Sequence, residues 1–315
     1  MKFDLLSSLW LHEPDSAAIA RAASELGLPT AEPGELALAY ADLFLLNVYP
    51  YGTAYTDPDG ELNAPEAHEL ATLFEAYGYC PSELNEVAAP DHLGLCLGFL
   101  SHVSSLRAAE EPTLTRSVST GGEAISSQRS LRGFAPRNDH LTSVLLKWIP
   151  VCCLAVERDP TAHRFYRALA KVTRERLMAE TPIPNTQYPI HHSSFIIHHS
   201  EVTLRDLVRF FLAPAQCGIF LSRSRFGQIA NELGLALPFG SRFEVAELLF
   251  TSAGAERIER LIGVLSEEVM GWAAEYRSWA EAYPAWSPVA AAWLARTAQS
   301  ERTLSEMRAT IAAVA

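Results

Sequence analysis

Apolar residues recur three, four and seven positions apart along most of the chain, which is the spacing of one face of an α-helix. Capping residues, glycines and prolines mark the ends of these segments. In the first eighty residues they predict one helix from Asp15 or Ser16 to Gly27, one from Glu35 to Val48 and one from Pro65 to Gly78.

The next predicted helices carry the most apolar sequence. One begins near Asp91 and has apolar residues all round it, which is typical of the centre of a helical bundle. One covers about 141–156 and contains Pro150, so a kink is expected there. Asp159 and Pro160 then resemble the N-cap and first residue of a further helix.

The second half of the chain continues in the same style. Two capping boxes precede apolar runs, at Thr203 with Asp206 and at Ser241 with Glu244. Ser287 begins another helix, and the apolar positions after residue 303 predict a separate last one. No run alternates apolar and polar residues for long enough to build a sheet. The predicted fold class is therefore all-α, a helical bundle with a helical C-terminal extension.

Two segments interrupt the helical pattern. Residues 115–139 are polar and rich in glycine and serine, and residues 184–200 contain a repeated His-His-Ser unit. Both are interpreted as inserted surface loops that are exposed, mobile and dispensable, because lengthening a surface loop costs little closure entropy. The predicted organisation is a helical domain over 1–183, the loop 184–200 and a helical C-terminal part over 201–315.

The histidines of the second segment are candidate metal ligands, since His-rich tracts bind zinc or nickel. They are His191, His192, His198 and His199. No cysteine or carboxylate flanks them, so adventitious nickel affinity is favoured over a physiological metal site.

Charge and cysteine content narrow the class of protein. The formal net charge is −12, which argues against nucleic-acid binding and favours a basic partner. The five cysteines form no CxxC pair and fit reduced, buried thiols. No segment resembles a membrane span or a secretory signal, so a cytoplasmic protein without a membrane span is expected.

Three stretches carry a resemblance to a known family. They are Tyr49-Pro50-Tyr51-Gly52-Thr53-Ala54-Tyr55, then Ala89-Pro90-Asp91-His92-Leu93, and finally Trp148-Ile149-Pro150 followed by Phe165 to Ala170. In order and spacing the chain resembles the TorD/DmsD/NarJ family of molybdoenzyme maturation chaperones over about residues 35–180.

The resemblance implies a bundle of the TorD-like type and a function without catalysis. Such a chaperone binds the apo catalytic subunit of a molybdenum-containing oxidoreductase, or its twin-arginine leader peptide, and assists cofactor insertion before export or assembly. It holds no cofactor of its own, apart from a possible transient contact with a molybdopterin nucleotide. The family implies a monomer or a dimer that exchanges helices.

The candidate client-binding residues follow from the same motifs: Tyr51, Tyr55, Pro90, Asp91, His92 and Trp148. Each has an alternative reading from its chemistry. Asp91 is equally well an N-cap, and the tyrosines are equally well core aromatics. Joint acid–base catalysis by Asp91 and His92 is disfavoured because neighbouring helical residues point in different directions.

Two other sets of residues leave alternatives open. A local basic group is formed by Arg205, Arg209, Arg223 and Arg225. It either makes salt bridges, which is the favoured interpretation, or contacts a phosphate-bearing pterin nucleotide or an acidic surface of the client. A metal-dependent hydrolase using His92 and Asp91 and a structural subunit of an oxidoreductase complex remain the alternative functions. No GxxxxGK[ST], GxSxG or HExxH motif is present.

Overall fold

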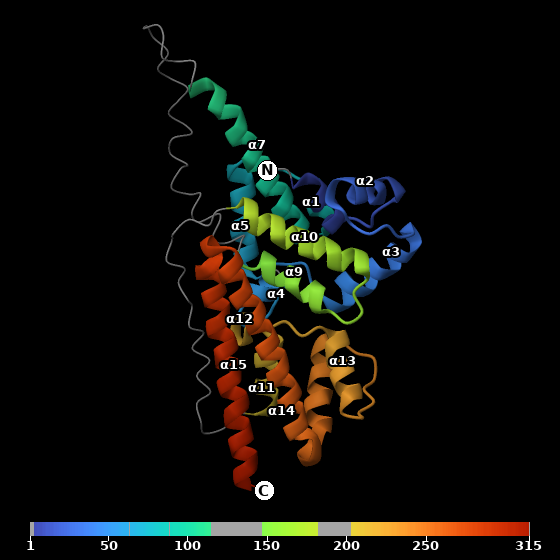
Figure 1. Ribbon diagram of the computed structural model, residues 1–315, viewed down its shortest axis with the longest axis vertical. Coiled ribbons are helices and arrows are strands. Elements are labelled where there is room, and N and C mark those ends of the chain that lie inside the picture. The colour runs from blue at the N-terminus through green and yellow to red at the C-terminus, as the bar shows by residue number, and fades with distance from the viewer. Residues whose placement is uncertain (1–2, 63, 88, 115–146, 182–202, 315) are drawn as a thin grey trace.

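The computed structural model describes residues 3–62, 64–87, 89–114, 147–181 and 203–314. Its first part consists mostly of short helices, together with the longer α7, which extends beyond the others, and α10 (Figure 1). They are α1 (Asp4–Leu11), α2 (Ser16–Leu26), α3 (Pro33–Tyr40), the π-helix η1 (Ala41–Asn47), α4 (Thr53–Thr56), α5 (Pro65–Ala76), α6 (Leu84–Val87), α7 (Leu93–Leu114), α9 (Ile149–Arg158) and α10 (Arg164–Glu180).

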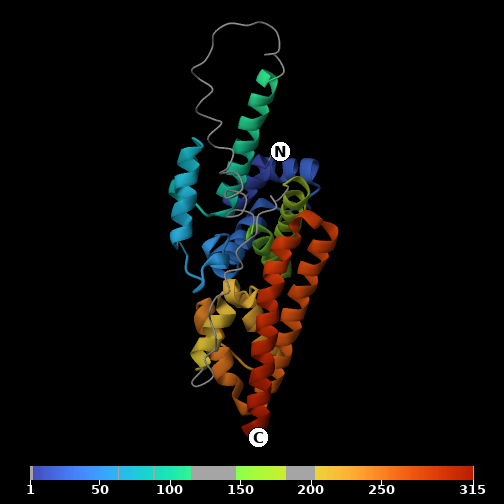
Figure 2. The ribbon, with the colours of Figure 1, turned by 90° about the vertical axis from the view of Figure 1, so that its left-hand side faces the viewer.

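The remaining helices extend the molecule toward the C-terminus, where α14 and α15 lie side by side as a long antiparallel pair (Figures 1 and 2). They are α11 (Leu204–Leu212), α12 (Pro214–Cys217), α13 (Arg223–Glu232), α14 (Arg242–Ala282), the 3₁₀ turn η2 (Pro284–Trp286) and α15 (Ser287–Val314). The described residues hold helices and no strand, which confirms the all-α class.

Buried apolar side chains form one cluster that runs through both parts of the chain, from Phe3 to Leu304. The first half of α7, from Leu93 to Val103, supplies buried side chains to this cluster, as its apolar sequence predicts, and α1 packs along it, whereas Leu106 further along α7 is 43% exposed. The two helices touch closely because Gly94 has no side chain: a Cβ there would lie 2.9 Å from the Ser7 carbonyl oxygen. The Ser7 hydroxyl donates to the Gly94 carbonyl at 2.7 Å.

Indole and guanidinium groups fasten the α14–α15 pair to the first part. The Trp286 indole donates to the Met178 carbonyl at 3.1 Å, and the Trp293 indole donates to the Lys147 carbonyl at 2.8 Å. The guanidinium of Arg174 lies 5.6 Å from the Trp279 ring centre and makes an ion pair with Glu157 at 2.7 Å. The cation–π contact between Arg174 and Trp279 is stronger when water is excluded.

Most predicted helix ends are confirmed. Asp15 caps α2 by accepting from the Ala18 amide at 2.8 Å, and Gly27 ends that helix with a φ of 68°. Gly78 and Gly234 likewise follow their helices in the left-handed region. The capping boxes at Thr203 with Asp206 and at Ser241 with Glu244 are both formed.

Four predicted elements are wrong in detail. Pro150 does not kink a helix: it lies in the first turn of α9, where a missing N–H costs nothing. Asp159 does not cap the next helix, because α10 begins at Arg164 with His163 as its cap. The two helices predicted after Ser287 are the single helix α15. The helix predicted over 35–48 is α3 followed by a π-helical stretch.

Helix α1 has no counterpart among the predicted elements. The two predicted insertions, 115–139 and 184–200, lie outside the described residues. Within the residues that are described, no helix is long and apolar enough to cross a membrane.

Candidate functional site

The Tyr-Pro-Tyr-Gly stretch and the Pro-Asp-His-Leu stretch, far apart in sequence, lie against each other. Tyr51 and His92 form an isolated antiparallel bridge. The Leu93 amide donates to the Pro50 carbonyl at 2.7 Å, and the Gly52 amide donates to the Asp91 carbonyl at 3.0 Å. The turn into α4 is thereby fixed to the start of α7, and we call this contact the motif junction.

The Asp91 carboxylate caps a helix other than its own. Its Oδ2 accepts from the Thr53 amide and from the Thr53 hydroxyl, both at 2.8 Å, at the start of α4. The side chain is buried, and this burial raises its pKa above the usual value despite the two bonds to Thr53. The capping interpretation is right about the chemistry of Asp91 and wrong about the helix it caps.

The start of α7 is capped by His92 instead. Its Nδ1 accepts from the Gly94 amide at 3.2 Å, and its ring meets the Tyr51 ring edge-on with centres 5.0 Å apart. Burial lowers the pKa of His92 to about 3, so the ring is neutral near pH 7. A neutral ring whose Nδ1 is engaged is a structural acceptor, and it is poorly placed to act as an acid or base for a ligand.

The aromatic residues of the motifs form the wall behind this junction. Tyr55 and Trp148 are both buried and stack with their ring centres 5.9 Å apart and an interplanar angle of 16°. Phe220, from the C-terminal part, packs on Tyr55 at 5.2 Å. Gly52 lies directly under the indole, where a Cβ would be 2.8 Å from the Trp148 ring. These contacts make the aromatics part of the core.

A very small cavity lies between α4, α5 and Trp148. Its volume is about 10 Å³, room for about one water molecule, and Glu66, Asp91 and Lys147 line it. Burial lowers the pKa of Lys147, while nearby Glu66 acts in the opposite direction. The motifs did not point to Lys147 or Glu66; the only sequence signal is a lysine that directly precedes a motif tryptophan in an apolar stretch.

The structure therefore brings all the predicted site residues together at the motif junction. Pro90 is buried with Asp91, His92, Tyr55 and Trp148. Tyr51 keeps partial exposure, and its hydroxyl donates to the Val87 carbonyl at 3.3 Å. Client contact by these residues stays a prediction, and in this conformation they hold helices together.

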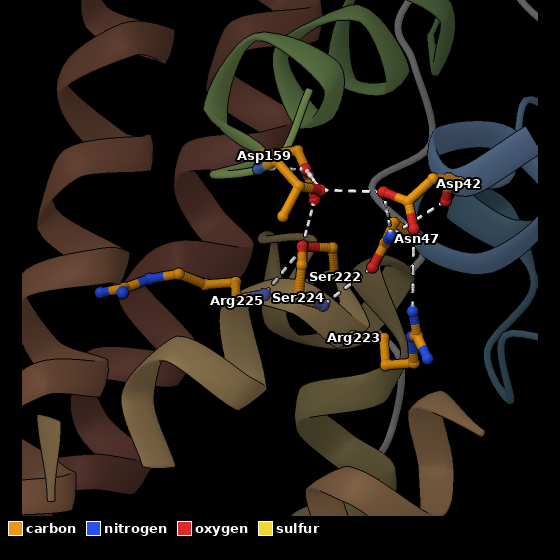
Figure 3. Close-up of polar contacts among 8 residues, drawn as sticks. Asp42, Asn47, Asp159, Ser222, Arg223, Ser224 and Arg225 are labelled. Carbon is orange, nitrogen blue, oxygen red and sulfur yellow. Dashed lines mark hydrogen bonds and ion pairs between the residues drawn. The ribbon is translucent and has the colours of Figure 1, made fainter. Parts of the chain in front are cut away.

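A second polar cluster joins the motif-bearing part to the C-terminal part (Figure 3). At its centre the Asp159 carboxylate accepts from the Ser224 hydroxyl at 2.5 Å and from the Thr161 amide and hydroxyl at 2.9 and 2.8 Å. The Ser224 amide donates to Asn47 Oδ1 at 2.8 Å. The cluster thus joins η1 and the end of α9 to the first turn of α13.

Sequence patterns did not reveal this polar cluster, because Asn47, Asp159 and Ser224 are far apart in the sequence and none of them belongs to a motif. The nearest signal was Asp159, interpreted as a cap for the following helix. Its carboxylate does accept from an amide and from hydroxyl groups, but one of these donors, Ser224, is 65 positions away in the sequence. Within the described part of the chain, no histidine bonds to Asp159 or Ser224, so the pair lacks the base that would activate a serine nucleophile.

The four arginines of the predicted basic group do not converge. Arg225 makes ion pairs with Glu232 at 2.9 Å and with Glu268 at 2.8 Å, and Arg223 approaches Asp42 at 4.0 Å. The salt-bridge interpretation is confirmed for these two residues. Arg205 lies over the Phe243 ring at 5.8 Å.

Arg209 instead lines a cavity of about 410 Å³ between the 57–61 loop and α11. Asp59 and Glu61 line the same cavity, so it presents both signs of charge. A site for a phosphate group needs several converging donors, and this arrangement does not provide them.

Within the described residues, no group of three or more His, Cys, Asp or Glu side chains is placed to hold a metal ion. The four histidines of the 184–200 segment lie outside the described residues. The cysteines at 96, 152, 153 and 217 are buried free thiols, whereas Cys80 is exposed.

Fold and site together define an all-helical protein whose most distinctive motifs build its core rather than an open catalytic cleft. Residues 11–154 match the family model of the nitrate reductase delta subunit. That family is one of redox enzyme maturation chaperones, and residues 11–154 of this chain are similar to it. No match was found among curated proteins or solved structures.

Proposed function

We propose that this protein is a chaperone for a molybdenum-containing oxidoreductase. It binds the cofactor-free catalytic subunit, or the N-terminal leader of that subunit, in the cytoplasm and releases it after cofactor insertion. The observation that carries the proposal is the family match over residues 11–154, a segment that holds the Tyr-Pro-Tyr-Gly, Pro-Asp-His-Leu and Trp-Ile-Pro stretches. The family description makes the catalytic subunit of a nitrate reductase the first client to test.

The chemistry of the surface supports a basic client. A chain with a formal net charge of −12 attracts a partner rich in lysine and arginine and repels an acidic one. A hydrolase that uses His92 and Asp91 has less support, because both side chains are buried and bonded within the fold. No cofactor is part of the proposal.

The experiment is co-expression of the full chain with the nitrate reductase catalytic subunit, in cells that can or cannot make the molybdenum cofactor. The chain should carry an affinity tag other than polyhistidine, because of the histidines at 191–199. Recovery of the catalytic subunit only from cofactor-deficient cells is the expected result. Equal recovery with the mature enzyme would identify a permanent subunit, and no recovery from either strain would contradict the proposed client.

A further inference from the structure

The acidic charge of this protein is concentrated in one stretch. Residues 22–106 contain thirteen aspartates and glutamates and no lysine or arginine. This stretch therefore carries a formal charge of −13, while the whole chain carries −12. It includes α3, η1, α4, α5 and α6, and within it Glu35 and Asp42 lie on the α3–η1 helix with side chains that are 58% and 47% exposed.

Within this acidic stretch, the α3–η1 helix leaves leucines exposed. Leu38 is 77% exposed, Leu45 is 66% exposed and Leu46 is 39% exposed. Glu35 and Asp42 lie three residues before Leu38 and four after it, so the three share a helix face. We call these five residues the leucine ridge. Single exposed leucines are common, but a cluster on one short helix is typical of an interaction surface.

The local helix geometry explains why these leucines face outward. Leu43 and Phe44 are buried, and the chain from Ala41 to Asn47 is π-helical. Along this turn the two buried side chains are followed directly by two exposed ones, Leu45 and Leu46. Such π-helical stretches occur frequently at functional sites.

Phe239 extends this apolar surface from the C-terminal part. It is 81% exposed, and the Arg223 guanidinium lies 4.4 Å from the centre of its ring. The same guanidinium approaches the Asp42 carboxylate at 4.0 Å, and Figure 3 shows these two side chains pointing toward each other. Phe239 is therefore tied, through Arg223, to the middle of the leucine ridge.

We propose that the leucine ridge and Phe239 together form the docking surface for a basic amphipathic segment of the partner. Leucine-sized side chains of that segment cover Leu38, Leu45 and Phe239. Its lysines or arginines lie beside the half-exposed carboxylates of Glu35 and Asp42. A second copy of this chain fits poorly, because it would bring two acidic faces together. Identifying the partner as the client subunit rests on the proposed function.

The first test uses a designed peptide and the full chain. The peptide is a helix with leucines at i, i+3, i+4 and i+7 and lysines at both ends, and its reference has glutamates in place of the lysines. The Leu38→Ser/Leu45→Ser variant is compared with Met270→Ser, which alters an apolar residue that is 54% exposed on α14 and does not belong to the ridge.

Fluorescence anisotropy should show binding of the lysine peptide to wild type and to the Met270→Ser variant. The ridge variant should bind about tenfold more weakly, because the apolar area covered by the peptide is lost. Raising the salt from about 50 to about 300 mM should weaken binding further, since exposed charges are screened. Equal affinity of wild type and ridge variant, equal binding of the glutamate peptide, or no binding to wild type would each overturn the proposal.

The second test separates this surface from the proposed function. The wild type, the ridge variant and the Met270→Ser variant are each co-expressed with the cofactor-free catalytic subunit. Loss of the subunit from the ridge variant alone supports the docking surface. Retention of the subunit by all three overturns the surface and leaves the proposed function standing, whereas its absence from all three contradicts the proposed function.

Light scattering on the same three proteins tests whether a second copy of this chain occupies the surface instead. A wild-type dimer that becomes a monomer in the ridge variant would assign the surface to a second copy of this chain and overturn the proposal. A single mass shared by wild type and both variants is the expected outcome.

Discussion

Gly52 and Trp148 illustrate, at the scale of single residues, what the family motifs do in this fold. The glycine lies under the indole, and the indole stacks on Tyr55 in the core. The φ of Gly52 is −59°, which any residue can adopt, so glycine is required here by space and not by backbone conformation. Substitution therefore acts on packing alone.

Replacing Gly52 with alanine should destabilise the protein by about 1–3 kcal/mol, because the added Cβ would press on the Trp148 ring in a filled core. Urea unfolding of the wild type and the variant measures the difference. Gly34→Ala in α3 is the matched control, because a Cβ there meets no atom within 4 Å. Equal stability of the two variants would show that the indole moves aside freely.

His92 gives a second test at this scale, through pH. Its pKa is about 3 in the folded chain and about 6.5 when unfolded, so between these values the unfolded chain binds the extra proton. Its contribution to stability is complete above pH 6.5 and is lost as the pH falls toward 3. At pH 5 the loss should be about 2 kcal/mol relative to neutral pH, from about 1.4 kcal/mol per pKa unit.

The His92→Asn variant isolates this effect, since its side-chain oxygen can still accept from the Gly94 amide. Urea unfolding at pH 7.5 and pH 5 should show a smaller loss of stability on acidification for the variant than for wild type. The exposed His68→Asn is the control and should keep the wild-type pH dependence. An unchanged pH dependence in His92→Asn would mean that His92 is protonated without cost in the fold.

The sequence predicts which residues form most of the motif junction, but it does not predict which residues they contact. The sequence motifs identify Asp91 and His92, and helix-capping chemistry explains what each does. The partner of Asp91 is 38 positions away at Thr53, and nothing in local spacing points to it. The burial of the aromatics also depends on Phe220, which belongs to the C-terminal part of the chain.

At the scale of elements, capping residues predict the ends of helices well, whereas prolines predict them less well. Asp15 and Ser241 cap their helices because the bonds they make are local. Pro150 is compatible with both a kinked interior and a first turn, and the sequence alone does not distinguish them. Helix α1 was missed because it is only eight residues long and is fixed by its contact with α7.

The contact between η1, α9 and α13 can be tested by removing the carboxylate at its centre. Asp159→Ala removes the acceptor for three donors, two of them from Thr161 and one from Ser224. These bonds are part-buried and their acceptor is a carboxylate, and a hydrogen bond to a charged group contributes about 1.5–3 kcal/mol. Water replaces some of the lost bonds, because Thr161 is exposed, so a total loss of about 2–4 kcal/mol is expected. Chemical unfolding measures this loss.

Asp15→Ala provides the comparison, because it removes an exposed cap with one bond and should cost about 1 kcal/mol. Hydrogen exchange adds a local readout: in Asp159→Ala the first turn of α13 should lose protection, while α2 should not. A loss of stability no larger than that of Asp15→Ala would show that Asp159 is not what holds α13 to α9.

For the whole molecule, the structure connects the family segment to residues beyond it. The match ends at residue 154, yet the core runs on to Leu304 as one cluster. Tyr55 packs on Phe220, and the Lys147 and Met178 carbonyls accept from the indoles of Trp293 and Trp286. Sequence patterns predicted helices in this C-terminal part but gave no means of telling whether they pack on the first part.

Removing residues 203–315 should therefore prevent the first part from folding cooperatively. The truncation uncovers Tyr55, leaves the Lys147 and Met178 carbonyls without their indole donors, and deprives Asp159 of Ser224. An ordinary domain has a free energy of unfolding of only about 5–15 kcal/mol. The free energy lost when this apolar surface is exposed to water should exceed that value. The fragment should aggregate, or unfold in urea without a sharp midpoint.

Co-expression of residues 203–315 as a separate chain serves as the control, because it restores every one of these contacts without a covalent link. The two pieces should then purify together and unfold in a single transition close to that of the intact protein. A fragment of residues 1–202 that unfolds alone with a sharp midpoint would show that the family segment is an independent domain. In that case the Trp279, Trp286 and Trp293 contacts would join two separately stable bodies.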